Sequence, residues 1–223
     1  MSEDVRFSRR RLLGSSVALA GIGAAGALVP GIARALESTF FLEMGPFYPV
    51  AKPLDQDADL TIVAGRTERA KGQILHFMGR VLNRKGEPVA GARLEVWQAN
   101  TFGRYDHPSD PNPAPLDPNF QGSATLMTDA EGRFRFKTIK PGPYPTANPN
   151  VWRPPHIHFD VSGKADRLVT QVFFPGEPMN EGDFVYQAIR RNKDGSVCKY
   201  LPPAAGMEPD SRIAYWDIVL PTG

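Results

Sequence analysis

Two histidines two positions apart form the clearest chemical pattern in this sequence. His156 and His158 lie in the run WRPPHIHF at residues 152–159. Residues two apart in a β-strand point to the same face and stand about 6–7 Å apart along it, so their imidazoles can bind one metal ion. The opposite face would turn Ile157 and Phe159 toward a core. Two surface histidines on a half-exposed strand would give the same pattern.

The remaining ligands of such a metal would be oxygen donors. Cys198 is the one cysteine of the chain, which excludes a zinc site built on several thiolates and any internal disulfide. Asp160 falls on the same strand face as the histidines and could complete a site of two histidines and one carboxylate. Tyr105 and Tyr144 stand in Gly-rich and Pro-rich segments after expected strands, where a tyrosine is also commonly a packed or corner residue. Spacing alone does not choose between these oxygen donors.

Short strands and turns are expected to position these residues. The chain has 21 Gly and 22 Pro among 223 residues without a collagen-like period, which is typical of a turn-rich all-β domain. We predict an all-β fold, a two-sheet β-sandwich with little helix and with long active-site loops at 106–122 and 140–155. One short helix is expected, over 184–191. Patterns of apolar and polar residues predict strands over 74–82, 93–98, 124–128, 134–139, 157–161, 168–174 and 213–220. The strands 124–128 and 134–139 are expected to form a hairpin.

The N-terminus has the features of an export signal. Arg9 and Arg10 precede an apolar run at 17–29, and Ala-Arg-Ala at 33–35 matches a cleavage signal. Adjacent arginines resemble a twin-arginine signal, and the run is short for a membrane anchor. We therefore expect a periplasmic or otherwise exported protein without stable membrane insertion after leader removal.

Three segments are expected along the chain. They are a signal peptide at 1–35, an N-terminal arm at 36–71 and a β-sandwich domain at 72–223. The leader carries five Arg and two acids, so removing it leaves 21 basic and 22 acidic residues and changes the net charge from +2 to about −1. No basic stripe is left, and no nucleic-acid partner is expected.

Several ordered segments resemble the intradiol ring-cleavage dioxygenases. These are LEVWQAN at 94–100, GRY at 103–105, TIKPGPYP at 138–145, WRPPHIHF at 152–159 and TQ at 170–171. The resemblance runs in order from about residue 72 to 220. It is closest to the iron-bearing subunit of the protocatechuate 3,4-dioxygenases.

The resemblance implies a non-haem Fe(III) enzyme. Such an enzyme inserts O2 between the hydroxyl-bearing carbons of a catechol-type aromatic diol and gives a muconate-type diacid. Arg153 matches the arginine that steadies charge on the substrate ring, and Gln171 matches a glutamine near the active site. The counterpart of Tyr144 leaves the metal when substrate binds. The residues that match the iron ligands are Tyr105, Tyr144, His156 and His158.

The arm and the partners follow from the same resemblance. GPFYP at 45–49 resembles the arm that borders the substrate pocket, where Phe47 or Tyr48 would contact the substrate; a proline-stiffened turn is the simpler alternative. Protocatechuate enzymes build their pocket from two different chains. A homo-oligomer is one way in which this chain could complete its pocket.

Two other functions stay open at this stage. Residues 79–92 and 128–134 also resemble non-catalytic β-sandwich modules that exported proteins use for binding or spacing. A ferrous enzyme using His156, His158 and Asp160 is the third interpretation. Bound iron with a burgundy colour would indicate ferric tyrosinate, colourless bound iron the ferrous site, and no metal the module.

Overall fold

The fold is that of a computed structural model, which describes residues 35–52 and 57–222. Residues 1–34, which make up nearly all of the expected signal peptide, lie outside the described residues. Within the described residues, no helix is long and apolar enough to cross a membrane.

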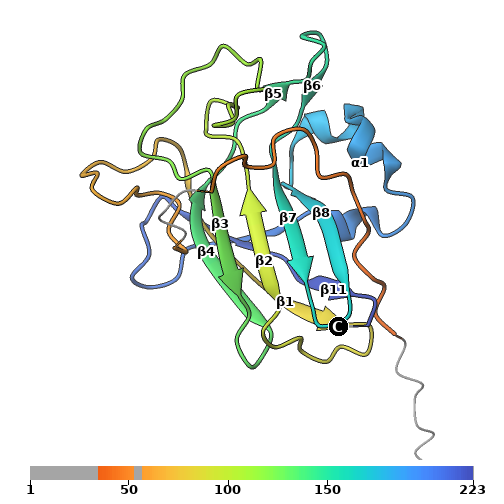
Figure 1. Cartoon of the computed structure of the whole chain (residues 1–223). Helices are drawn as coiled ribbons and strands as arrows, with labels where there is room; N and C mark the ends of the chain where they lie inside the picture. The colour runs from red at the N-terminus through yellow and green to blue at the C-terminus, as the bar shows by residue number, and fades with distance from the viewer. Residues whose placement is uncertain (1–34, 53–56, 223) are drawn as a thin grey trace, which may run out of the picture. The chain divides into compact units, whose positions relative to one another are not determined.

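Two β-sheets pack face to face, which confirms the expected all-β sandwich (Figure 1). The first sheet has the order β11-β1-β10-β9, with β4 also paired to β1, and the second has the order β3-β2-β7-β8. The strands of the first sheet are β1 (Ile74–Asn83), β4 (Arg133–Ile139), β9 (Lys199–Leu201), β10 (Arg212–Tyr215) and β11 (Ile218–Leu220). Those of the second are β2 (Arg93–Trp97), β3 (Ser123–Met127), β7 (His156–Ser162) and β8 (Arg167–Phe173).

The expected hairpin between the third and fourth predicted strands is wrong. β3 pairs with β2, whereas β4 pairs with β1, so the turn between them connects the two sheets. The turn itself forms, because the amide of Gly132 donates to the carbonyl of Asp129. Turn residues specify a chain reversal but do not specify which strand becomes the partner, since both strands bury apolar residues in the same core.

The last predicted strand is interrupted. Residues 213–220 form β10 and β11, which both pair in parallel with the same strand, β1. Leu75 is opposite Arg212 and Val81 is opposite Ile218, so the two pieces keep one common register. Between them the carboxylate of Asp217 accepts a hydrogen bond from the backbone amide of Arg80 at 2.9 Å in place of a main-chain partner.

Aromatic rings fill the space between the sheets. Phe77 of β1 stacks on Phe136 of β4 with ring centroids 5.1 Å apart and contacts Phe159 of β7 at 5.5 Å. All three rings are buried. Because side chains alternate along a strand, the inward position of Phe159 turns His156 and His158 to the outer face of the second sheet.

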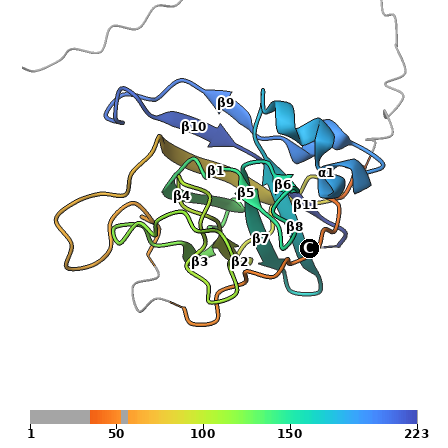
Figure 2. The same cartoon turned by 90° about the horizontal axis from the view of Figure 1, so that it is seen from above.

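An arm and three short elements cover that outer face. The first part of the arm, residues 36–52, runs across β7 and β8, where the amide of Leu42 donates to the carbonyl of Val169 (Figure 1). From above, β9 and β10 lie on the side opposite the arm (Figure 2). The short elements near the site are β5 (Tyr144–Pro145), β6 (Trp152–Arg153) and the helix α1 (Phe184–Ala188), which lies within the expected helical range.

Candidate functional site

The two histidines lie on the outer face of the second sheet and are buried. His158 of β7 is opposite Trp97 of β2 on one side and Gln171 of β8 on the other. The ring of Trp97 stacks on the imidazole of His158 at 4.7 Å and 10°. Each histidine is 2% exposed, so the interpretation as two surface histidines is wrong. Their Nε2 atoms are 3.2 Å apart.

The surroundings of both imidazoles favour the neutral form, which can bind a metal ion through a nitrogen lone pair. Burial lowers the pKa of His156 and of His158 well below the usual value, and the positive charge of Arg153 lowers both further. Nδ1 of His156 lies 2.7 Å from the carbonyl oxygen of Pro154, which can only accept a hydrogen bond. Nδ1 therefore carries the proton, and the lone pair of Nε2 faces the site.

Two tyrosines, Tyr105 from the loop after β2 and Tyr144 from β5, reach the same place. Tyr144 Oη lies 3.4 Å from Nε2 of His156, and the ring of Tyr105 stands perpendicular to that of Tyr144 at 5.2 Å. A glycine permits this approach: Gly103 has φ +78°, and a Cβ there would lie 1.9 Å from the carbonyl oxygen of Pro143. Both tyrosines therefore lie beside the histidines.

Without a bound metal ion, burial favours the neutral form of both phenols. Burial raises the pKa of Tyr105 well above 10 and also raises that of Tyr144, although the charge of Arg153 opposes both increases. Among the described residues, the buried Oη of Tyr105 makes no hydrogen bond of acceptable geometry, although Tyr144 is near enough to influence its pKa. A bound cation would both partner this oxygen and lower its pKa.

Arg153 extends toward the same atoms from β6. Its Nη1 lies 3.3 Å from Nε2 of His156 and 3.5 Å from Oη of Tyr144. Its Nη2 donates to Oε1 of Gln171 at 3.0 Å. Asp183, which the sequence reasoning missed, binds the other edge of the guanidinium. Asp183 immediately precedes the expected helix, a position that signals a helix cap but not an arginine partner 30 residues away.

The two aromatic residues of the arm differ in position. Phe47 lies against the tyrosines, with ring centroids 4.8 Å from Tyr105 and 5.8 Å from Tyr144. Tyr48 turns away, and its hydroxyl donates to Oε2 of Glu95 at 2.5 Å. Phe47 is therefore the arm residue placed at the candidate site.

Asp160 does not join the histidines. Its carboxylate forms a two-point ion pair with Arg167, with distances of 3.0 and 2.7 Å. In the part of the chain that is described, no group of three or more His, Cys, Asp or Glu side chains is arranged to hold a metal. The interpretation as a two-histidine, one-carboxylate site is therefore wrong.

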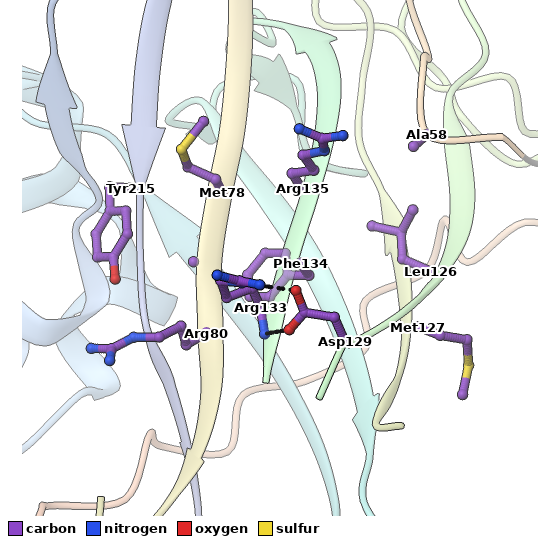
Figure 3. A pocket seen from close by; sticks show the side chains of 11 residues that line it. Ala58, Met78, Arg80, Leu126, Met127, Asp129, Arg133, Phe134, Arg135 and Tyr215 are labelled. Carbon is purple, nitrogen blue, oxygen red and sulfur yellow. Dashed lines mark hydrogen bonds and ion pairs between the residues drawn. The ribbon is translucent and has the colours of Figure 1, made fainter. Parts of the chain in front are cut away.

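Two hollows differ in their relation to this chemistry. A cavity of about 590 Å³ adjoins Tyr105, and its lining also includes Phe47 and Trp97. A hollow of about 740 Å³ is lined by residues of β1, β4 and β10 of the first sheet and of β3 of the second, and Arg133 pairs with Asp129 beside it (Figure 3). The second hollow contains none of the candidate ligands, so its greater size does not make it the reaction site.

Comparison with known proteins gives matches over most of the described chain. The profile of a family described as dioxygenase matches residues 44–222. The chain is 52% identical over 138 residues to the protocatechuate 3,4-dioxygenase beta chain of Burkholderia cepacia, covering 60% of this chain and 58% of that protein. It is 33% identical over 198 residues to the hydroxyquinol 1,2-dioxygenase of Rhodococcus opacus, covering 82% of this chain and 60% of that protein. The chain thus spans less than two thirds of these relatives' length.

A solved structure shows the same fold. It is the dioxygenase domain of a dioxygenase and carbohydrate-binding protein fusion from the cellulolytic bacterium Streptomyces sp. SirexAA-E. The identity is 27% and the TM-score 0.62, with 84% of this chain and 100% of that chain covered. With the family profile covering residues 44–222, these matches show that the chain belongs to the dioxygenase family.

Proposed function

We propose that this protein is a non-haem iron(III) intradiol dioxygenase. It would insert both atoms of O2 between the hydroxyl-bearing carbons of a catechol-type diol and give a muconate-type diacid. The observation that carries the proposal is the convergence of two imidazoles and two phenols in one buried place, with His156 Nε2 3.2 Å from His158 Nε2 and 3.4 Å from Tyr144 Oη. Membership of the dioxygenase family supports it.

The donor set fits a ferric ion. Two neutral imidazoles and two phenols that ionise on binding would offset two of the three positive charges and leave room for a further anionic ligand. The buried, unpartnered oxygen of Tyr105 is the sign within this structure that a partner belongs there. The residues that would hold the iron are Tyr105, Tyr144, His156 and His158.

The ion, when bound, supplies the Lewis acidity and the electronic contact that make an aromatic diolate reactive toward O2. The chain's own residues do the rest. Oη of Tyr144 can accept a proton from an incoming phenolic hydroxyl, and Nη1 of Arg153 can donate to negative charge on the ring. Phe47 and Trp97 give the adjoining cavity apolar walls that suit an aromatic ring.

The experiment is to load the purified protein with iron and to assay ring cleavage of catechol, protocatechuate and hydroxyquinol. We expect stoichiometric iron, a burgundy tyrosinate-to-iron absorption band and O2 uptake that matches diacid formation. Tyr105→Phe and His158→Ala should each abolish the band and the activity together. A fully active, colourless variant would refute the ligand assignment.

Matched controls separate the site from general effects. Tyr215→Phe and His76→Ala remove the same chemical groups outside the site, since Tyr215 is on β10 and His76 pairs with Glu208. Both should retain colour and turnover. A protein that binds no iron would instead favour the non-catalytic module.

Export and assembly complete the proposal. Residues 1–35 would direct twin-arginine export, residues 36–71 would serve as the arm and residues 72–223 as the catalytic domain, with a second copy as one way to complete the pocket. Replacing Arg9 and Arg10 by Lys should retain the protein in the cytoplasm. Cell fractionation and sedimentation equilibrium test these two statements.

A further inference from the structure

The guanidinium of Arg153 is held along one edge by Asp183, and its Nη1 faces the candidate metal ligands. Its Nε donates to Oδ2 of Asp183 at 2.9 Å, and its Nη2 donates to Oδ1 of Asp183 at 3.1 Å and to Oε1 of Gln171 at 3.0 Å. These bonds use three of its five N–H groups. The two N–H groups of Nη1 are left to face His156 Nε2 and Tyr144 Oη.

Asp183 is itself fixed in place. The residue is 1% exposed, and its Oδ1 accepts the backbone amide of Tyr186 at 2.8 Å as the N-cap of α1. Its own amide donates to the carbonyl of Asn180 at 3.1 Å. Because a planar carboxylate and a planar guanidinium joined at two points have one shared orientation, a fixed Asp183 fixes the direction of Arg153.

The network also reaches the arm. Nε2 of Gln171 donates to the backbone carbonyl of Glu43 at 2.9 Å, while its Oε1 accepts from Arg153. The orientation of the guanidinium is thus tied to α1 on one side and to the arm on the other.

We infer that Asp183 is a positioning residue, which directs Nη1 of Arg153 at the place where negative charge develops on the substrate ring. The inference rests on the proposed function and adds to it a residue outside the candidate ligand set. In the alternative, purely structural role, Asp183 would only cap α1 and form an ion pair with Arg153, without any effect on the reaction. The two roles differ in what happens when the carboxylate is replaced and the cap is kept.

Asp183→Asn and Asp183→Ser make that separation. Asn and Ser are good N-cap residues, so α1 keeps its cap. The Asn amide would place a donor against the Arg153 donors, and the Ser side chain is too short to reach them. Glu181→Gln is the matched control, because it removes an exposed negative charge from the same turn without contacting Arg153.

We expect both Asp183 variants to keep iron content and the tyrosinate absorption band, since no candidate ligand changes. Their kcat should fall about 10- to 100-fold. This fall is no larger than the fall in kcat that removing one preorganised hydrogen-bond donor typically causes. Anaerobic titration with catechol, followed by visible absorption without turnover, should give a Kd within about threefold of the wild type. Glu181→Gln should match the wild type throughout.

A double-mutant cycle gives the decisive comparison. In an Arg153→Ala background, Asp183→Asn should lower kcat no further, because its effect passes through the guanidinium. Unchanged kcat in the single variants, an additive loss in the double variant, or failure of both Asp183 variants to fold would overturn the inference alone. An iron-loaded wild type that cleaves no diol would overturn the proposed function and the inference with it.

Discussion

Replacing Gly45 by alanine tests whether the arm presses on the candidate metal site. Gly45 has φ +75°, a conformation in which side chains are strained, and an added Cβ would lie 3.2 Å from Cε1 and 3.9 Å from Nε2 of His158. Ordinary carbon contacts are about 3.5–4.0 Å, so either the arm or the imidazole must shift by a few tenths of an ångström. Trp97 stacks on the imidazole at 4.7 Å and resists its movement.

The effect of Gly45→Ala has two parts, backbone strain and contact with His158, which a control variant can separate. The left-handed backbone strain should cost about 1–2 kcal/mol, which lowers the Tm of a chain of this size by about 2–8 °C. Gly65 has φ +81° with nothing within 4 Å of an added Cβ, so Gly65→Ala carries the strain without a contact. Any further effect of Gly45→Ala then comes from His158.

Thermal unfolding, iron titration and the visible spectrum are the assays. Both variants should lose similar stability, but only Gly45→Ala should weaken iron binding, by about tenfold, as changes beside metal ligands commonly do. Wild-type iron affinity and spectrum in Gly45→Ala would refute the argument that the arm supports His158. Equal loss of iron in Gly65→Ala would show a general effect of destabilisation.

Three further predictions concern the core, the arm and the outer face. Phe159→Ala should lower the free energy of unfolding by about 3–5 kcal/mol in urea titrations, because it empties the centre of the sandwich. Tyr48→Phe should cost about 1.5–3 kcal/mol and speed proteolysis of the arm, because it removes a hydrogen bond to the buried carboxylate of Glu95. The hydrogen bond from Lys137 lowers the pKa of Glu208 to about 2. Glu208→Gln should therefore cost less than about 1 kcal/mol at pH 7, with the difference fading as pH falls from about 4.5 to 2, when measured by Tm across pH.

Each of these has a contradicting result. A loss below about 1 kcal/mol in Phe159→Ala would mean that the sheets close over the missing ring. Unchanged proteolysis in Tyr48→Phe would show that the arm is held by its other contacts. A Glu208→Gln difference that grows at acidic pH would have the wrong sign for a carboxylate whose pKa is depressed in the folded state.

The strands could be predicted because alternation is a local signal. The predicted range 74–82 is observed as Ile74–Asn83, and 93–98 as Arg93–Trp97. The pairing of strands could not be predicted in the same way, as the misplaced hairpin shows. β5 and β6 have two residues each, too few for any period to be read from their sequence.

In the candidate site, too, the features that depend on local sequence could be predicted, whereas those that depend on contacts between distant segments could not. The placement of His156 and His158 on one face follows from strand geometry alone. The meeting of Tyr105 with Tyr144 depends on two segments that touch where Gly103 leaves room for the carbonyl of Pro143, and no spacing in the sequence encodes that contact. Family resemblance supplied what periodicity could not.

Asp183 marks the limit of both kinds of reasoning. It lies 30 residues from Arg153 in the chain, and it reads locally as nothing more than a helix cap. In the folded chain the same carboxylate caps α1 and accepts hydrogen bonds from the guanidinium of Arg153. One buried carboxylate therefore links α1 to the candidate site. A buried ion pair costs desolvation and is a weak source of stability, whereas its two-point geometry is a strong source of orientation. The burial of the Asp183–Arg153 pair is therefore better explained by the direction that the pair gives to Nη1 of Arg153 than by its contribution to the stability of the fold.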